Sequence, residues 1–315
     1  MRLICCTILA LTTCFSTDAA EPEKLTFEPG KPLKYRIERV LTGTVKVLGE
    51  TQKTDEKWIM DVDVTPSEPD AQGRIKLSVQ ATHVEGSAPV ILGLAPKQVD
   101  FDDTKWREGS PVPASLFLPC LAMKRHPLEL VYEPSGKLAA TGDLKPLAAA
   151  VDAMLAKDFQ SQPDFPNTRV MFQLIFTEGL HKTIWDDLLV VDLPPQFEPG
   201  VEWKEKKLTY IQPFYAWLDA THLAEESADG GLEIESTYKA PAGKPANIKF
   251  GNQDYDYTVK NGEGTGTFKL DPDGKVRELD TTWHVYFSVT LNAGGQRIPF
   301  DEFYQRLKYK IERKE

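Results

Sequence analysis

Cysteine is nearly absent from the 315-residue chain, which has four. Three of them, Cys5, Cys6 and Cys14, lie in the N-terminal leader described below, so the rest of the chain holds one thiol, Cys120. That remainder can form no internal disulfide. A chain of this length buries roughly three quarters of its unfolded surface, so a hydrophobic core is enough to stabilise it.

Long hydrophobic runs are absent as well. The most apolar stretch covers residues 3–15, whereas a membrane-spanning helix needs about 20 apolar residues. A basic residue, Arg2, precedes this stretch, small residues including Ala19 and Ala20 follow it, and charged residues come next. This order is typical of a secretory signal peptide. We therefore predict a signal peptide at 1–20, cleaved near Ala19 or Ala20, no transmembrane segment, and a secreted or periplasmic protein.

Cys14 leaves an alternative open, because its surroundings loosely resemble the bacterial lipobox, in which the cysteine is acylated. That box normally has Gly, Ala or Ser before the cysteine, where this chain has Thr13. A lipid anchor at Cys14 is therefore disfavoured against simple cleavage. The chain also lacks any Asn-x-Ser/Thr glycosylation site, which is compatible with a bacterial envelope.

Basic charge is in deficit, since 37 Lys and Arg residues face 47 Asp and Glu residues for a net charge of −10. Such a chain repels phosphate backbones and anionic membrane surfaces, so we predict no nucleic-acid partner. With 41% apolar and 27% charged residues, the composition is that of a globular protein rather than a disordered or coiled-coil one.

Apolar residues alternate with polar ones along most of the chain, which is the pattern of half-buried β-strands. Glycine-containing turns separate these runs, as hairpins require. We therefore predict antiparallel sheet. The alternating runs include 33–38, 58–64, 75–81, 232–234, 268–270, 283–291 and 307–311, and the turns include 70–73, 134–136, 229–231 and 272–274.

The middle of the chain has helical rather than alternating spacing. Asp143 can cap a helix over 144–157, which carries one apolar stripe. A second helical stretch runs over 168–190, with Gly179 as a candidate break. The predicted division is a signal peptide at 1–20, an N-terminal β-rich repeat at 21–142, a helical connection at 143–192 and a C-terminal β-rich repeat at 193–315.

The two β-rich parts match each other in short segments. Four segments of the first recur in the same order in the second, and the offset between partners shrinks steadily, as two diverged copies with a longer first-half loop require. The pairs are 27–30 with 197–200, 71–75 with 228–232, 100–102 with 254–256, and 133–138 with 271–276. Outside this series, 33–39 matches 307–313, as two amphipathic edge strands would.

The predicted fold class is therefore α+β and β-rich. It consists of two diverged antiparallel β repeats, each a curved sheet or half-barrel, joined by a central helical segment that covers one open face. Whether the halves form two domains or one shared sheet stays open at this point.

Several of these features occur together in one family. The chain has a Tyr-containing first strand after Gly30, a Gly-centred hairpin, the segment 100–102 with its Asp-Phe-Asp sequence, a helical centre, and a restart from Pro195 to Trp203. In this combination it resembles the secreted bacterial proteins grouped as domain of unknown function 6263. The resemblance covers most of the chain after the leader, although Asp103 stands where a small hydroxyl residue is expected. It implies an architecture and secretion, and no activity or site.

Sequence motifs for catalysis and metal binding are incomplete. The segment 83–85 with Pro119-Cys120 matches part of the zinc deaminase pattern, but Met123 replaces its second cysteine. Cys120 and His126 could pair as thiol and imidazole, yet a small, buried, apolar role for Cys120 is favoured. The five histidines show no ligand spacing. We predict no catalytic residue, no metal site and no cofactor.

Two glycine-containing segments also have simple interpretations. The segment 271–274 begins like an EF-hand loop, but Thr282 stands where the bidentate Glu belongs. The glycines of 262–266 precede a strand rather than a helix, so a strand entry or bulge is favoured over a phosphate loop. Close carboxylates such as Asp61 and Asp63 are expected on a solvated face.

Aromatic residues cluster in the second half, and they have two interpretations. They could line a pocket for an apolar or sugar ligand between a curved sheet and the central helices. Core packing is favoured, because strand alternation already accounts for Trp283 and Phe287. The cluster comprises Tyr210, Phe214, Tyr215, Trp217, Tyr255, Tyr257, Trp283 and Phe287.

These observations predict a non-catalytic binding or scaffolding protein of the bacterial envelope, whose partner is an unidentified protein, a glycan or an apolar ligand. The basis is a well-formed core pattern without a recognisable nucleophile, metal or cofactor motif. The alternative is a glycan-directed hydrolase that uses carboxylates from separate strands. Two carboxyl groups about 5–10 Å apart in an aromatic cleft would favour the hydrolase, whereas an enclosed apolar cavity would favour a carrier.

Overall fold

The computed structural model describes residues 25–92, 95–105, 117–159, 169, 176–186, 188–194, 197–211, 213–250 and 253–314. The predicted signal peptide at 1–20 and the alternative anchor at Cys14 lie outside these residues, as does part of the predicted second helix. None of the helices in the described part of the chain has the length and apolar character that crossing a bilayer requires.

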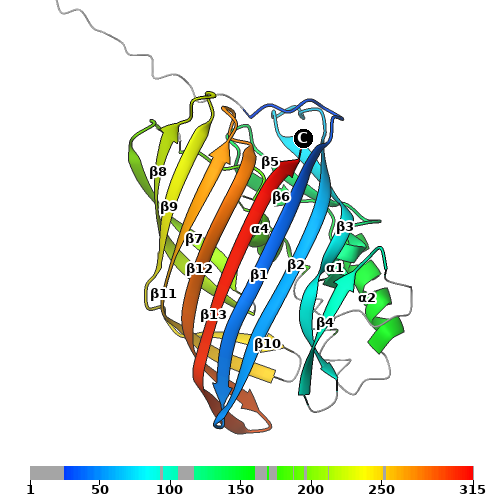
Figure 1. Ribbon diagram of the computed structural model, residues 1–315, viewed down its shortest axis with the longest axis vertical. Coiled ribbons are helices and arrows are strands. Elements are labelled where there is room, and N and C mark those ends of the chain that lie inside the picture. The colour runs from blue at the N-terminus through cyan, green and yellow to red at the C-terminus, as the bar shows by residue number, and fades with distance from the viewer. Residues whose placement is uncertain are drawn as a thin grey trace, which may run out of the picture.

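The strands form one antiparallel sheet of thirteen strands, strongly curved, as Figure 1 shows. Its order is β6-β5-β3-β2-β1-β13-β12-β11-β9-β8-β7, with β4 paired to β3 and β10 paired to β11. The strands are β1 (Leu33–Val47), β2 (Glu50–Pro66), β3 (Ile75–Leu92), β4 (Ala95–Asp102), β5 (Leu128–Tyr132), β6 (Leu138–Thr141), β7 (Glu202–Ile211), β8 (Phe214–Glu226), β9 (Leu232–Ala240), β10 (Ala246–Phe250), β11 (Gln253–Leu270), β12 (Val276–Ala293) and β13 (Gln296–Lys314).

The predicted β-rich, curved antiparallel architecture is confirmed, and its cause is the alternation in the sequence. Successive residues of β9 are alternately buried and exposed, as in a sheet with one covered face. The predicted strand segments all lie inside observed strands. In the predicted turns, Gly73, Gly136, Gly230 and Gly274 have positive φ, which glycine adopts without a steric penalty.

The two halves of the chain share this single sheet through β1 and β13. These strands pair antiparallel along nearly their whole length, with Ile37 opposite Ile311. The matching segments 33–39 and 307–313 are therefore neighbours at the centre of the sheet, and the prediction that they are edge strands is wrong. Alternation reports which face of a strand is buried, but it does not report which strand lies beside it.

The described helices lie on the concave side of the sheet in Figure 1, and they are α1 (Phe117–Ala122), α2 (Lys145–Phe159) and α4 (Glu178–Trp185). Helix α2 occupies the place where the sequence predicts a helix over 144–157. The side chain of Thr177 caps α4 by accepting from the backbone N–H of Leu180. Gly179, the candidate break, lies in the first turn of α4. The sequence did not predict α1, because a single short turn with Pro119 near its start has no helical periodicity.

The segment after α4 is packed between the two halves of the sheet. Val190 forms a β-bridge with Lys275, in the turn between β11 and β12. The carbonyl of Val191 also lies over Gly136, in the turn between β5 and β6, where an added Cβ would stand 3.0 Å from its oxygen. A side chain at position 136 would have almost no room. The segment after α4 and the two turns therefore hold one another in place.

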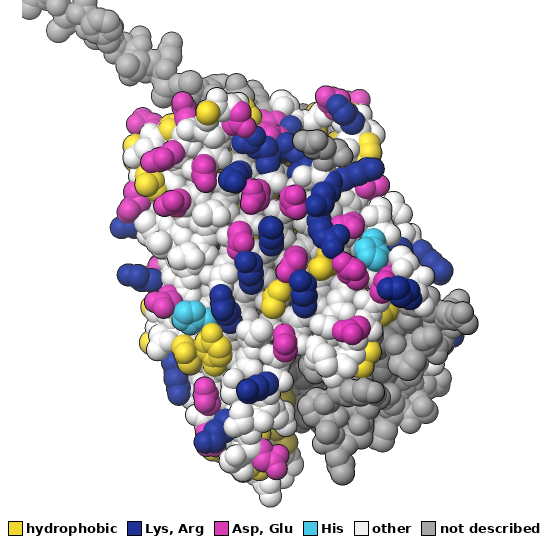
Figure 2. All heavy atoms as spheres, in the orientation of Figure 1, with side chains coloured by type: hydrophobic (Ala, Val, Ile, Leu, Met, Phe, Trp, Pro, Cys, Tyr) yellow, Lys and Arg dark blue, Asp and Glu magenta, His cyan; other side chains and the backbone are white. Residues whose placement is uncertain are grey.

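The convex face of the sheet is polar. Figure 2 shows Lys and Arg side chains interspersed with Asp and Glu across its strands. Ion pairs connect neighbouring strands on this face, such as Lys308–Asp280 at 3.0 Å and Arg36–Asp61 at 3.2 Å. Asp61, one of the close carboxylates in the sequence, therefore belongs to a partly solvated ion-pair face. The concave face holds the core and the pocket described next.

Candidate ligand-binding pocket

A row of residues that includes several polar side chains crosses the concave face where the two apolar clusters of the core meet. Trp283 marks this boundary, because it packs against both clusters. Residues paired directly across neighbouring strands lie on the same face, so the sheet register gathers positions that are distant in the sequence. From β2 to β7 the row reads Trp58, Arg39, Tyr309, Thr281, Gly266, Ser236, His222 and Trp203.

Arg39 and Glu56 form a buried ion pair within this region. They are 3% and 5% exposed, and Arg39 Nη1 lies 2.9 Å from Glu56 Oε1. Arg39 also hydrogen bonds with the side chain of Tyr309. A buried charge is tolerated when it is paired and hydrogen-bonded, so these groups form a fixed polar centre on the concave face of the sheet.

Burial sets the protonation of the groups around this centre. It raises the pKa of Tyr309, against the opposing effect of Arg39, and it raises the pKa of Tyr210. Burial also raises the pKa of the Cys120 thiol to about 12, and the charged groups that act on this thiol are Arg39 and Glu56. At neutral pH both phenols keep their protons and Cys120 carries no thiolate, which is the form that reacts.

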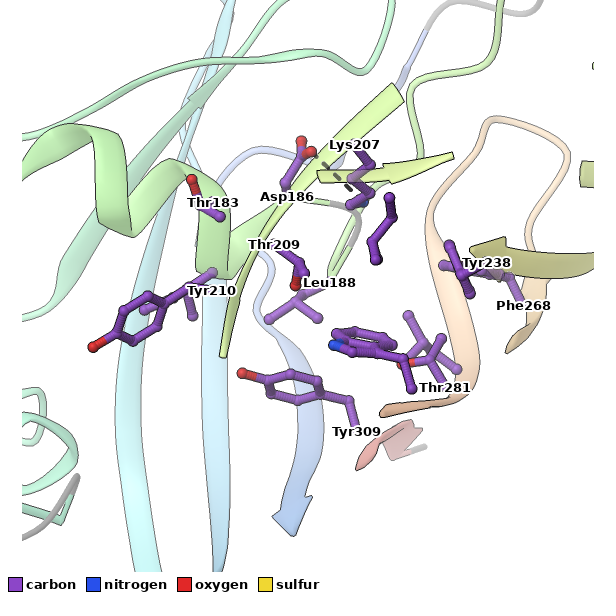
Figure 3. Close-up of a pocket in the computed structure, with 14 residues that line it drawn as sticks. Thr183, Asp186, Leu188, Lys207, Thr209, Tyr210, Tyr238, Phe268, Thr281 and Tyr309 are labelled. Atoms are coloured by element: carbon purple, nitrogen blue, oxygen red, sulfur yellow. Dashed lines mark ion pairs between the residues drawn. The ribbon is translucent and has the colours of Figure 1, made fainter. Parts of the chain in front are cut away.

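A pocket lies between α4 and the concave face (Figure 3). The space between its lining atoms, together with the open solvent at its mouth, is about 510 Å³. The described lining residues are Thr183, Ile184, Asp186 and Leu188 from α4 and the segment after it, Lys207, Thr209 and Tyr210 from β7, and Leu218, Tyr238, Phe268, Leu279, Thr281, Trp283 and Tyr309 from the other strands.

Three aromatic rings form a continuous wall of this pocket. The ring of Trp283 lies 5.8 Å from that of Tyr238 and 6.0 Å from that of Tyr309, centre to centre. Gly264 of β11 is the register partner of both Trp283 and Tyr238. An added Cβ at Gly264 would stand 2.5 Å from Trp283 Cβ. Because Gly264 has no side chain, the side chains of Trp283 and Tyr238 can lie over the backbone at this position.

Some polar groups of the residues that line the pocket have an ionic or hydrogen-bonding partner, and one such group of the described lining does not. At one end, Lys207 Nζ pairs with Asp186 Oδ2 at 3.6 Å, drawn as a dashed line in Figure 3. In the wall, by contrast, the buried Nε1 of Trp283 has no hydrogen-bond partner among the residues that the structure describes. Buried polar atoms are normally hydrogen-bonded, and the Nε1 of Trp58, outside the pocket, is likewise without a partner in the described part of the chain.

A second polar group lies further along the row, around His222. Its Nδ1 is 2.7 Å from Ser236 Oγ, and its Nε2 is 3.2 Å from Glu205 Oε1. The hydrogen bond with His222 holds the pKa of the Glu205 carboxyl below its usual value. Trp203 stacks on the imidazole at 4.9 Å. Because Ser236 is 2% exposed, this arrangement satisfies buried polar atoms and does not present a nucleophile to solvent.

A group with metal-ligating side chains lies outside the pocket. One ligand atom each of His83, Asp102 and Asp103 lie within 4.8 Å of one another. His83 Nδ1 is 2.6 Å from Asp103 Oδ1, and the ammonium group of Lys124 pairs with the same carboxylate. Lys124 supplies the positive charge that a metal ion would bring. The structure thus joins His83 of the 83–85 segment to Asp103 in an ion-pair group.

The aromatic residues singled out in the sequence serve different purposes. Phe214 and Phe287 pack in the smaller apolar cluster, with ring centres 5.2 Å apart. Tyr210 and Trp283 line the pocket. Trp217 points to solvent and is 59% exposed. Core packing and pocket lining therefore each account for part of the set.

Sequence reasoning missed several residues of this region, including Lys207, Thr209 and Tyr309. They occupy ordinary positions in alternating strands, and only the register brings them to one place. A signal did exist for Arg39 and Glu56. Alternation places both on the buried face of their strands, where a charged residue is unusual unless it is paired.

Comparisons with known proteins assign no family to the chain. No protein-family model matches it, and no curated protein matches it. Among solved structures, lipovitellin, described in a study of its lipid–protein interactions, aligns over 92% of this chain with a TM-score of 0.49 and 8% identity. A protein of unknown function from Nostoc punctiforme, of the DUF3598 family, aligns over 89% of this chain and 95% of its own, with a TM-score of 0.11 and 9% identity. The chain spans about a quarter of the lipovitellin chain (26%). Likenesses this distant assign no function.

Proposed function

We propose that the protein is a non-catalytic binding protein that holds a small molecule with an apolar body between α4 and the concave face of its sheet. The observation that carries this proposal is the pocket wall, in which the neighbouring rings of Tyr238, Trp283 and Tyr309 lie beside polar groups such as the Lys207–Asp186 pair. Apolar walls with a few placed polar groups are the usual make-up of small-molecule sites.

The groups around the pocket suit recognition better than bond cleavage. Among the described lining residues, Asp186 is the one carboxylate, and Lys207 pairs with it. The hydroxyls of Tyr210 and Tyr309 stay protonated for the reason given above, so they serve as hydrogen-bonding groups rather than as bases. Cleavage of a glycan by the purified chain would contradict this proposal and favour the hydrolase alternative.

The proposal places this binding protein in the bacterial envelope, on the basis of the signal peptide predicted at 1–20 and the resemblance to the domain of unknown function 6263. It also treats the halves of the sheet as diverged copies. Matching turns support this point, since Gly136 N–H donates to the Glu133 carbonyl just as Gly274 N–H donates to the Asp271 carbonyl. One sheet built from two such halves provides the long concave face that the pocket requires.

A fluorescence titration with the neutral apolar dye N-phenyl-1-naphthylamine tests the proposal. We expect saturable binding at one site per chain. The substitution Thr183→Phe places a ring in the pocket from α4 and should abolish this binding. The matched control, Thr237→Phe, makes the same change at an exposed position of β9 and should leave binding intact. Equal binding by both variants, or no saturable binding by the natural chain, would contradict the proposed site.

A further inference from the structure

We propose that the convex face of the sheet carries a second binding site, which holds a neutral, extended polysaccharide across the strands. The site is a row of surface aromatic residues, Trp217 of β8, Tyr286 of β12 and Tyr304 of β13. It lies on the opposite face from the pocket, because Tyr286 alternates with the buried residues Val285 and Phe287. The inference therefore goes beyond the proposed function and does not depend on it.

The sheet register aligns this aromatic row beside a line of polar residues. Tyr286 pairs directly with Tyr304. Both tyrosines and Trp217 lie two residues from the polar line, on the same side of it, and residues two apart share a face of a strand. The strands β9 and β11 separate Trp217 from Tyr286, which is about 14 Å at the usual strand spacing. From β2 to β7 the polar line reads Asp55, Thr42, Arg306, His284, Glu263, Lys239, Asp219 and Lys206.

The aromatic side chains of this row stand out on a polar face. Four large apolar side chains are exposed in the described part of the chain, and two of them are Trp217 at 59% and Tyr286 at 39%. The rings of Tyr286 and Tyr304 lie 4.8 Å apart, and His284 lies 5.9 Å from Tyr304. Figure 2 shows an apolar patch next to a histidine on this face. Apolar groups that adjoin one another at the surface, rather than scattered singly, indicate a binding site.

The charges beside the row favour an uncharged partner. The polar line holds three carboxylates and three Lys or Arg side chains, and they alternate in sign. Glu263, for example, lies 3.6 Å from His284 and is the register partner of Lys239. Nucleic acids and anionic lipids are bound by an excess of positive charge, which this line does not provide. It provides hydrogen-bond donors and acceptors side by side.

A chain of linked sugars matches both parts of this surface. A pyranose ring has an apolar face of C–H groups, which packs on an aromatic ring as other apolar surfaces do. Its rim of hydroxyl groups donates and accepts hydrogen bonds, as the polar line requires. Because Trp217 and the tyrosine pair are about 14 Å apart, the ligand must be an extended chain of several rings. Sugars joined by β-1,4 bonds form such a chain, whereas α-1,4 bonds make the chain coil.

Isothermal titration calorimetry with two neutral hexasaccharides of glucose tests this proposal. Cellohexaose is β-1,4-linked and extended, and maltohexaose is α-1,4-linked and coiled. We expect cellohexaose to bind. We expect maltohexaose to bind about five- to tenfold more weakly, because it reaches one part of the row and loses an aromatic contact at the other.

Two substitutions locate the binding on the convex face. Trp217→Ala and Tyr286→Ala should each lower the affinity for cellohexaose about five- to tenfold, the effect of one aromatic contact. Leu48→Ala is the matched control, because Leu48 is 78% exposed but lies in the turn between β1 and β2, outside the row. That variant should keep the affinity of the natural chain. Thermal unfolding of each variant shows that it is folded.

Several outcomes would overturn the proposal. They are the absence of cellohexaose binding, equal binding of the two hexasaccharides, and undiminished affinity in both aromatic variants. Self-association in sedimentation experiments that Trp217→Ala abolishes, without any binding of cellohexaose, would assign the row to contact between copies of the chain instead. None of these measurements uses the dye, so a failure of the concave pocket and a failure of this site are distinguishable.

Discussion

Arg39 and Glu56 form a buried charged pair, which restricts the substitutions that either position can accept. Both sit on the apolar face of their strands, and each is tolerated because the other neutralises it at 2.9 Å. The interaction is not a simple gain in stability, since both ions lose their water on folding. Its main consequence is that neither partner can be changed alone.

Removing one charge of this pair should therefore be far more harmful than removing both. We expect Glu56→Gln to lower the free energy of unfolding by about 3–5 kcal/mol, because Arg39 is left as a buried, uncompensated charge. The double substitution Arg39→Met with Glu56→Leu should recover most of that loss. Urea denaturation of the three proteins measures both effects. A double variant as unstable as the single one would show that the charges themselves stabilise the fold.

His181 is a second residue whose surroundings determine its chemistry. It is 8% exposed on α4, stacks with Phe176 at 5.8 Å, and its Nδ1 has no partner in the described part of the chain. Burial lowers the pKa of His181 to about 4, whereas an unfolded histidine titrates near 6.5. Between these values the unfolded chain binds the proton that the folded chain excludes.

The stability of the fold should therefore fall as the pH drops from about 6.5 to about 4. The contribution of His181 is absent above pH ~6.5 and reaches a loss of about 3 kcal/mol below pH ~4. His181→Phe should remove this component of the pH dependence, whereas His126→Phe, at a half-exposed position, should keep it. Denaturation midpoints measured across this range would refute the assignment if His181→Phe left the slope unchanged.

At the scale of the element, β11 determines the shape of the pocket. Gly262, Gly264 and Gly266 follow one another on the same face of the strand, and an added Cβ at each would stand less than 3 Å from a neighbouring atom. The strand also contains a bulge between Val259 and Asn261. Bulges and glycines bend a sheet and allow a close approach, here that of the rings of Trp283 and Tyr238.

Gly264→Ala should consequently destabilise the protein and disturb the pocket. Its Cβ would stand 2.5 Å from both Thr282 O and Trp283 Cβ, so the strand or the ring must move, at a cost of about 1–3 kcal/mol. Gly243→Ala is the matched control, because its Cβ would meet Val259 Cβ at an ordinary 3.5 Å. Thermal unfolding compares the two, and an equal effect would argue against a role for the glycine in pocket shape.

At the scale of the whole molecule, the sequence predicts where strands and turns lie along the chain, but it does not predict which strands pair with each other in the sheet. Alternation marks buried faces in β1, β9 and β12, and positive-φ glycines mark the turns. The pairing of β1 with β13 has no local signal, because it depends on which of many similar amphipathic strands fit together in three dimensions. Predicting edge strands at 33–39 and 307–313 fails for this reason.

The candidate site was predictable to a smaller extent. The sequence identifies an aromatic cluster that includes Tyr210 and Trp283, and it offers a pocket between sheet and helices as one interpretation. Lys207, Thr281 and Tyr309 come to the same place only through the register of four strands and the position of α4.

The pocket between α4 and the sheet is the proposed site of an apolar molecule. A crystal structure of the protein with N-phenyl-1-naphthylamine tests this site most directly. We expect the rings of the dye to lie against Tyr238, Trp283 and Tyr309. A pocket filled by protein side chains, with the ligand absent or bound elsewhere on the molecule, would contradict it.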